Sequence, residues 1–304
     1  MSSFRPAGNL RGAHGDRDNS HGFRHPCIYH SVCEPCPYAS AFSGRPGKRI
    51  AALINLSVAV VEYLVSRLVP CLAVVGCIGL AESENDCARG VSTVYGVDKY
   101  ELIYGLDIKS SLAPRLAGCG VKNFRFVNDA SAFALGECIG GAARQADRVL
   151  ALTLGTGVGS GFVAGRRLVE SGDDVPANGW VYCLPFEDTI VDDSFSTRWI
   201  CRRYKELAGE DVSGAKDVAE RYGNCDAARR LFDEYGERLA RFAVPVVERF
   251  RADALVLGGN ISRAYPLLGE PMKAVMDAMG CNVKVMVSSL MDKAALTGAA
   301  SLFA

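Results

Sequence analysis

Histidine, net charge and long apolar runs are what this sequence has least of. All four histidines lie in the first 30 residues. Lys and Arg (34) balance Asp and Glu (34), so no strong electrostatic field predicts binding to nucleic acid or to an anionic membrane. Glu62, Arg67 and Pro70 divide the most apolar stretch, Ile50 to Ala81, into pieces shorter than the ~18 residues of a membrane span. We therefore expect small molecules as partners, with a homodimer as a further option.

The cysteines give no sign of an oxidising compartment. All twelve are scattered without regular spacing, and no basic start followed by an apolar run and a cleavage site opens the chain. Reduced thiols and a cytoplasmic location are the expectation. One cluster, Cys27, Cys33 and Cys36 with His25 and His30, contains side chains that suit zinc, but its spacing matches no standard finger and we predict no metal site.

Composition divides the chain in two. Residues 1–49 are rich in Gly, Pro, Ser, Arg and Cys and show no apolar period, which predicts an irregular segment. From about Ile50, apolar stretches alternate with amphipathic ones, which indicates an α/β architecture, and Ile50 to Ala81 is expected to form a buried helix and then a buried strand. A chain of 304 residues exceeds the usual size of one core, so two domains with a cleft between them are expected.

Local patterns predict individual elements. Short apolar stretches bounded by turn residues predict strands at Lys122–Val127, Arg148–Leu154, Gly161–Ala164, Arg167–Glu170 and Ala254–Leu257. Longer stretches with helical character predict helices at Ala130–Ile139, Asp226–Phe250 and Ala294–Phe303.

Two glycine-rich segments follow predicted strands. In the loop from Gly155 to Gly161, missing Cβ atoms would let backbone N–H groups approach phosphate oxygens, although a tight β-turn explains the same glycines. A dinucleotide-binding fingerprint requires a helix after the loop, whereas a hairpin is predicted here, so that interpretation is the weakest. Gly258 and Gly259 would let a flat nucleobase pack against bare backbone, or would simply form a turn before a helix.

Asn128 and Asp129 lie between a predicted strand and a predicted helix. Open α/β sheets bind ligands at such strand ends, and a carboxylate there interacts favourably with the helix dipole. Asp129 could act as a general base toward an alcohol that attacks phosphorus. The alternative is an ordinary helix cap.

Four motifs in order resemble the ROK family of sugar kinases and sugar-responsive repressors, from about Gly90 to the C-terminus. They are VNDASAFALGE (127–137), LTLGTGVGSGF (152–162), LVLGGNIS (255–262) and AALTGAASLF (294–303). The resemblance implies a two-lobed, actin-like (ribonuclease-H-like) ATPase fold in which ATP and a hexose meet in the cleft. The implied lobes are residues 50–145 with the C-terminal helix 291–304, and residues 146–290.

The resemblance also implies residue roles. Asp129 would deprotonate the sugar hydroxyl, and Asn128 would bind a neighbouring hydroxyl. Gly155, Thr156, Gly157 and Gly159 would hold the phosphates of ATP with Mg²⁺, and Gly258, Gly259 and Asn260 would flank the adenosine. Asn178 falls near the family's Glu-x-Gly-His stretch, and Asp192 or Asp193 near its later sugar-binding Glu; a polar surface loop is the alternative for these three.

Two motifs expected from the resemblance are missing. The Asp-x-Gly-Gly-Thr hairpin, which handles phosphate and magnesium, does not occur in residues 1–100. The zinc motif is absent as well, because Cys183 and Cys201 are far apart with no His nearby, and we expect no zinc. Two functions follow as hypotheses: an ATP-dependent, glucokinase-like transferase of carbohydrate metabolism, or a non-catalytic sugar sensor. Residues 1–49 offer no helical period for a DNA-binding helix-turn-helix.

Overall fold

The computed structural model describes residues 72–77, 90–91, 105–117 and 123–303. Predictions for the irregular segment 1–49, for the helix expected after Ile50 and for the cysteine and histidine cluster lie outside these residues. The strand predicted after that helix is present as β1 (Leu72–Cys77). No helix among the described residues is long and apolar enough to cross a membrane.

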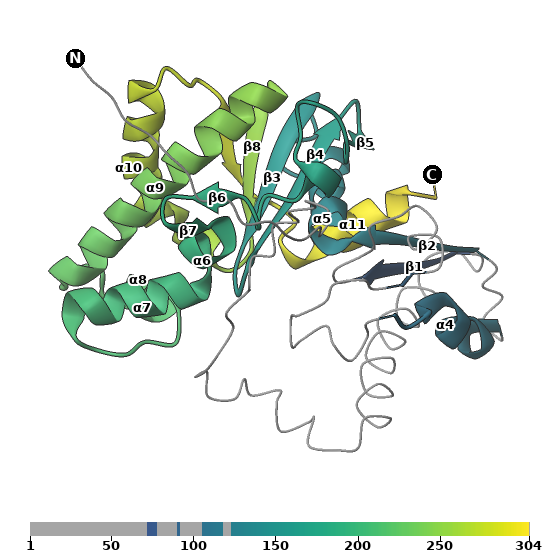
Figure 1. The fold of residues 1–304 in the computed structure, drawn as a ribbon, viewed down its shortest axis with the longest axis horizontal. Helices are drawn as coiled ribbons and strands as arrows, with labels where there is room; N and C mark the ends of the chain where they lie inside the picture. The colour runs from purple at the N-terminus through teal and green to yellow at the C-terminus, as the bar shows by residue number, and fades with distance from the viewer. Residues whose placement is uncertain (1–71, 78–89, 92–104, 118–122, 304) are drawn as a thin grey trace, which may run out of the picture. The chain divides into compact units, whose positions relative to one another are not determined.

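A five-stranded mixed sheet is the largest of the three described sheets (Figure 1). Its strand order is β5-β4-β3-β8-β9. The strands are β3 (Arg148–Leu154), β4 (Val158–Ala164), β5 (Arg167–Leu168), β8 (Ala254–Gly258) and β9 (Lys284–Val287). β3, β4 and β5 pair antiparallel, whereas β8 runs parallel to both β3 and β9. A hairpin needs only a short turn, so β3 and β4 are joined by Gly155–Gly157, whereas the parallel β8 is reached through a long helical connection.

Side-chain alternation along β3 explains why both faces of this sheet are covered. Leu150, Leu152 and Leu154 pack into one core with α9 (Asp226–Phe250), whereas Val149 and Ala151 pack into another with α5 (Asp129–Ile139). All five side chains are buried, as expected for a central strand between two helical layers. Leu231, Leu239, Val244 and Val247 of α9, apolar positions expected from the sequence, are buried.

A second sheet pairs β1 with β2 (Asn123–Asn128) in parallel, and its register sets Cys77 beside Asn128. The carboxyl ends of both strands therefore meet at the point where α5 begins. Before β2 lies α4 (Ile108–Leu116), whose N-terminus is capped by Asp107. α5 contacts β2 as well as β3 and β4.

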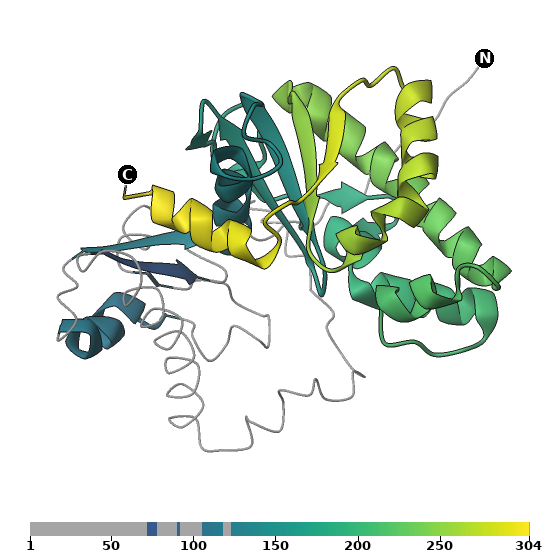
Figure 2. The ribbon, with the colours of Figure 1, turned by 180° about the vertical axis from the view of Figure 1, so that it is seen from behind.

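The last helix, α11 (Asp292–Ser301), runs alongside α5 (Figures 1 and 2). The contact is backbone to backbone: a methyl group added to Gly136 of α5 would overlap the carbonyl of Ala294, and one added to Gly298 would overlap the carbonyl of Ala132. Small residues at these crossing positions are what brings the two helices so close.

The structure corrects several predicted boundaries. β4 begins at Val158, three positions before the predicted Gly161, so the glycine-rich segment is mostly strand. β5 ends at Leu168 rather than Glu170, and α11 spans Asp292–Ser301 rather than Ala294–Phe303. β3 and α9 have their predicted bounds. The division into lobes at about residue 146 stays a prediction.

Several elements, most of them short, had no sequence prediction. They are η3 (Ala177–Gly179), β6 (Pro185–Phe186), β7 (Thr189–Ile190), α6 (Val191–Phe195), α7 (Thr197–Ala208), α8 (Ala215–Arg221), η4 (Ile261–Ala264) and α10 (Tyr265–Ala278). The first five of these lie between β5 and α8, and two of them, α6 and α7, bring polar side chains to the turn between β3 and β4.

Candidate functional site

Asn128 and Asp129 occupy the junction between β2 and α5, and only one of them is the helix cap. The Asn128 Oδ1 accepts hydrogen bonds from the N–H groups of Ala130 (3.0 Å) and Ser131 (3.2 Å), so Asn128 is the N-cap. Its NH₂ group is then the part of the side chain suited to a ligand. Asp129 lies in the first turn of the helix and is exposed. Asn128 is therefore the ordinary helix cap that the sequence left open, and the role of Asp129 as a general base stays a prediction.

The carboxylate of Asp129 lies at the positive end of α5. One of its oxygens accepts the N–H of Ala130 (2.9 Å). The positive end of the helix dipole attracts negative charge, and a carboxylate is a side chain that can accept a proton from a hydroxyl group. The arrangement therefore suits proton abstraction from a hydroxyl group held in front of the helix.

Close packing of α5 on β4 sets Asp129 beside the glycine-rich segment. A Cβ atom on Gly159 would lie 2.7 Å from the Ala130 Cβ, and one on Gly161 would lie 2.5 Å from the Ala134 Cβ. Glycine at these two positions lets the helix approach the strand. This packing explains the glycine at position 159, and the predicted phosphate role of Gly159 stays a prediction. We call the segment Gly155–Gly157, which joins β3 to β4, the glycine turn.

The glycine turn is fixed by the N-terminus of α7. The carbonyl oxygen of Gly155 accepts hydrogen bonds from the Thr197 N–H (2.7 Å) and from its hydroxyl group (2.9 Å). The carbonyl oxygen of Thr156 accepts one from Arg198 Nη1 (3.0 Å). Within the turn, the N–H of Gly155 donates to the carbonyl of Gly157 (3.0 Å). Two consecutive peptide groups are thereby held in fixed orientations.

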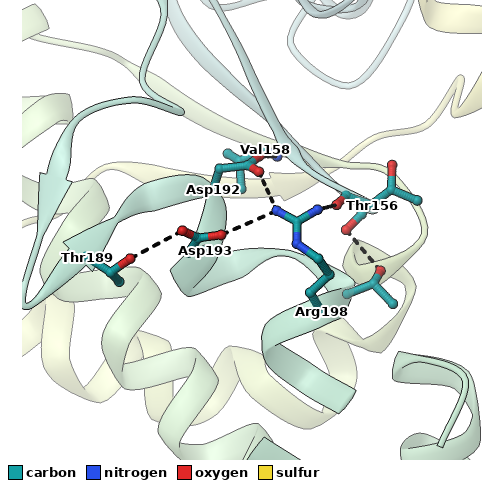
Figure 3. A network of polar contacts seen from close by, with 8 residues as sticks. Thr156, Val158, Thr189, Asp192, Asp193 and Arg198 are labelled. Carbon is teal, nitrogen blue, oxygen red and sulfur yellow. Dashed lines mark hydrogen bonds and ion pairs between the residues drawn. The ribbon is translucent and has the colours of Figure 1, made fainter. Parts of the chain in front are cut away.

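Two carboxylates from α6 complete this network (Figure 3). Asp192 accepts the backbone N–H of Val158 with one oxygen (2.7 Å) and Arg198 Nη2 with the other (2.7 Å). Asp193 contacts Arg198 Nη2 and the Thr189 hydroxyl more weakly, both at 3.4 Å. The Asp192 side chain is 18% exposed and that of Asp193 is 37% exposed. The structure therefore brings Asp192 directly to the glycine turn and connects Asp193 to it through Arg198, with Asp192 the more tightly held.

Asn178 lies in a turn that is attached to β4. Its backbone has a positive φ of 57°, and the following Gly179 has a φ of 67°. The buried hydroxyl of Ser160 donates to the Gly179 carbonyl (2.6 Å) and accepts the Val181 N–H (3.0 Å). One side chain of β4 thus holds this segment on both sides of Trp180, directly after the turn that contains Asn178. Asn178 itself is half-buried, which suits a side chain that contacts a ligand.

Gly258 ends β8 and Gly259 follows it, and protein atoms fill the space beside both glycines. A methyl group on Gly258 would overlap the Phe133 ring, and one on Gly259, whose φ is 79°, would overlap the Leu154 carbonyl. Packing and turn geometry alone therefore account for both glycines. The Ser262 hydroxyl donates to the Gly259 carbonyl (2.7 Å) and fixes the turn that precedes Asn260 in the predicted adenosine region. A role in binding adenosine stays a prediction.

Sequence reasoning missed Arg198, Thr197 and Ser160. Each acts on a partner 19 to 42 residues away, and none carries a local motif. The sequence offers at most a faint signal for this network: Asp192 and Asp193 are adjacent, and Thr197 and Arg198 follow them shortly afterwards. In the described part of the chain, no three or more His, Cys, Asp or Glu side chains form a group that could hold a metal ion.

A family model for the ROK family matches residues 71–304. The match confirms the resemblance and begins before Gly90, so the segment ahead of the first quoted motif belongs to it too. A curated relative, the glucokinase of Thermotoga maritima, is 29% identical over 205 residues, which are 58% of this chain and 64% of the relative. The chain thus spans less than two thirds of the length of that curated relative.

Solved structures show the fold. A ROK family glucokinase from Streptomyces griseus, in complex with glucose and AMPPNP, has a TM-score of 0.67 and 20% identity, with 83% of this chain and 87% of that one covered. A ROK family transcriptional regulator, a homologue of the Escherichia coli MLC protein, has a TM-score of 0.62 and 17% identity, with 82% and 66% covered. The predicted α/β, actin-like ATPase fold is thereby confirmed.

Proposed function

Because the chain belongs to the ROK family, we propose that it is an ATP-dependent sugar kinase that phosphorylates a hexose or a related sugar. The observation that carries this proposal is the junction of β2 and α5. There Asn128 caps the helix, which leaves the exposed Asp129 carboxylate in the first turn, and the packing of Ala130 on Gly159 keeps it close to the strand that follows the glycine turn. The named function of the Thermotoga relative supports the same proposal.

In the proposed reaction, Asp129 accepts the proton of the attacked sugar hydroxyl. The sugar oxygen forms a bond to the γ-phosphorus of ATP, the bond from that phosphorus to the bridging oxygen breaks, and ADP leaves with the bond's electron pair. Protonating Asp129 in this step is favoured because the alcohol becomes far more acidic as its oxygen bonds to phosphorus. The chain contributes orientation and a base, and ATP contributes the phosphoryl group.

Backbone and amide groups suit the substrates' polar atoms. The N–H groups of the glycine turn suit the phosphates of ATP. The Gly258–Asn260 segment would flank the adenosine. Sugar hydroxyls would be bound by the NH₂ group of Asn128, by Asn178 and by Asp193, whose carboxylate is the less engaged of the pair on α6. Mg²⁺ would accompany the phosphates, and we assign it no ligand among the described residues.

A second candidate function is a sugar sensor that binds without turnover. The Asp-x-Gly-Gly-Thr motif does not occur in the sequence of residues 1–100, and a transcriptional regulator shares the fold. Since positioning and charge neutralisation supply most of phosphoryl-transfer catalysis, loss of a phosphate-handling hairpin harms turnover more than sugar binding. We therefore expect sugar affinity to be retained better than kinase activity.

One experiment separates these functions. Calorimetry with glucose, N-acetylglucosamine, mannose and galactose measures sugar binding, and a coupled assay of ADP release on the same preparation measures turnover. Sugar binding with ADP release supports the kinase, and sugar binding without it supports the sensor. A preparation that is folded by circular dichroism but binds neither sugar nor nucleotide would refute both functions. Turnover of about 10 per second, typical of kinases, would show that another group replaces the missing hairpin.

A further inference from the structure

Arg198 contacts a backbone carbonyl of the glycine turn and both carboxylates of α6, which makes it the centre of the network in Figure 3. We infer that Arg198 and Asp192 act together as positioning residues that set the affinity of the glycine turn for the phosphates of the nucleotide. This inference rests on the proposed function. It also assigns Asp192 to the nucleotide side of the site, although the sequence predicted a sugar ligand there.

Peptide planarity determines where the N–H groups of the glycine turn point. In a trans peptide the C=O and the following N–H point in opposite directions. Thr197 fixes the carbonyl of Gly155, so the N–H of Thr156 points away from α7. Arg198 fixes the carbonyl of Thr156, so the N–H of Gly157 points the same way. Two consecutive N–H groups presented on one side form the kind of concave backbone that binds anions.

Asp192 connects the glycine turn to Arg198. One of its oxygens holds the N–H of Val158, which is the first residue after the turn, and the other holds the Arg198 guanidinium. A methyl group on Gly157 would lie 2.6 Å from the first of these oxygens, so the carboxylate lies against the turn itself. Each oxygen therefore holds one part of this network, the turn or its arginine, which is the geometry of a supporting residue.

Arg198 also offsets negative charge beside the glycine turn. Asp192 and Asp193 carry two negative charges next to a segment proposed to bind a polyphosphate, and like charges there oppose binding. The Arg198 guanidinium contacts both carboxylates and so offsets this repulsion while its other nitrogen holds the turn. A lysine ammonium is a single point and cannot reproduce the planar fork that contacts carbonyl and carboxylate together.

The test uses the full chain with Arg198→Met and Arg198→Lys, and Arg203→Met as the matched control. Arg203 lies on the same helix but pairs with Glu206 and Glu234. Calorimetry gives the dissociation constants of ADP and of the best-bound sugar separately, and thermal unfolding checks that each variant is folded. We expect Arg198→Met to raise the ADP Kd about tenfold or more, because hydrogen bonds from a charged group are lost, with the sugar Kd within about twofold of wild type. Arg198→Lys should fall between, and Arg203→Met should change neither constant.

A second experiment combines Asp192→Ala with Arg198→Met and compares the double variant with the two single variants. If the two residues act as one unit, the double variant with Arg198→Met should weaken ADP binding no more than about twofold beyond the worse single variant. A wild-type protein that binds sugar and ADP, with variants that keep the wild-type ADP Kd or lose sugar affinity alone, would overturn this inference and leave the proposed function standing. A folded wild-type protein that binds neither ligand would overturn both.

Discussion

Gly136 of α5 and Gly298 of α11 lie against each other with no room for a side chain on either: the backbone nitrogen of Gly298 is 3.0 Å from the point where a Cβ of Gly136 would stand. Each residue also abuts a carbonyl group of the opposite helix. α5 carries Asp129 at its start and contacts β2, β3 and β4, so the position of the proposed base depends on this crossing.

Gly298→Ala should therefore destabilise the protein although alanine is the better helix former. The helix propensity gain is about 1 kcal/mol, whereas overlap with the Ala132 carbonyl forces backbone to move, and such overpacking costs about 1–3 kcal/mol or more. We expect a net lower free energy of unfolding in urea. Gly140→Ala is the control, because its added methyl group would make only ordinary van der Waals contacts, the shortest of them 3.5 Å to Thr297. A Gly298→Ala protein more stable than wild type would show that the helices separate easily.

Glu137 should be among the most sensitive charged positions for stability. It is fully buried, and its carboxylate accepts hydrogen bonds from the Ser288 hydroxyl and from three backbone N–H groups, those of Ala142, Ser289 and Leu290. Glu137→Ala strands these donors and should cost about 3–5 kcal/mol, with Glu137→Gln intermediate because only one acceptor oxygen remains. Chemical denaturation measures both values.

The control for Glu137 is Glu220→Ala on the exposed surface of α8, which should lie within about 0.5 kcal/mol of wild type. Equal effects of the Glu137 and Glu220 substitutions would mean that the buried carboxylate does not hold the segment between β9 and α11.

Asp129→Asn should lower kcat about a hundredfold or more if the protein phosphorylates a sugar, because asparagine cannot accept the hydroxyl proton. Sugar affinity should be largely retained. Asp226→Asn is the matched control and should leave kcat unchanged. Asp226 is also exposed in the first turn of a helix, and the substitution removes the same charge. Steady-state kinetics on folded preparations measures the difference, and an unchanged kcat in Asp129→Asn would remove this residue from the mechanism.

Two buried serines allow the two sides of the site to be tested separately. The hydroxyl of Ser160 holds the turn that contains Asn178, and that of Ser262 holds the turn that precedes Asn260. Ser160→Ala should weaken sugar binding more than ADP binding, and Ser262→Ala should do the reverse, with a stability cost of about 1–3 kcal/mol each for the unpaired backbone groups. Identical binding profiles for the two variants would contradict the assignment of the two turns to different ligands.

Cys225 should be alkylated at lower pH than Cys183. A hydrogen bond from the Tyr204 hydroxyl, together with backbone N–H groups at the start of α9, lowers the pKa of Cys225, whereas partial desolvation raises the pKa of Cys183. A lower pKa means that the reactive thiolate forms at lower pH. Iodoacetamide labelling as a function of pH, read by peptide mass spectrometry, measures both cysteines.

Tyr204→Phe removes the largest contribution to the Cys225 shift and should move its labelling curve to higher pH. The Cys183 curve in the same variant is the internal control and should stay in place. Coincident curves for the two cysteines in the wild-type protein would contradict the prediction.

Long or strongly apolar elements were predictable, and short ones were not. β3 and α9 have their predicted bounds because a continuous apolar run and a 25-residue amphipathic pattern are unambiguous. α6 has five residues and β6 and β7 have two each, too few for any period to appear. α10 has a proline at its start and Pro271 inside it, which obscured a real helix.

The candidate site was likewise predictable only in part. Asn128, Asp129 and the glycine turn were found because they lie in motifs next to predicted elements. The sequence did not show that Asn128 would be the cap, that Gly159 would serve packing with Ala130, or that Arg198 would hold the turn. These facts depend on which distant segments fold against one another, and a single chain read along its length does not contain that information locally.

Successive residues of β4 face opposite sides of the sheet, which has a consequence for insertions and deletions. Gly159 and Gly161 face α5, whereas Ser160 between them faces the turn at Gly179 on the other side of the sheet. One residue added or removed between Val158 and Phe162 would exchange these faces, which would direct a side chain into α5 and leave the Gly179 carbonyl without its hydroxyl. The strand should therefore tolerate changes of residue type far better than any change of length, and natural relatives that keep both turns should keep its residue count.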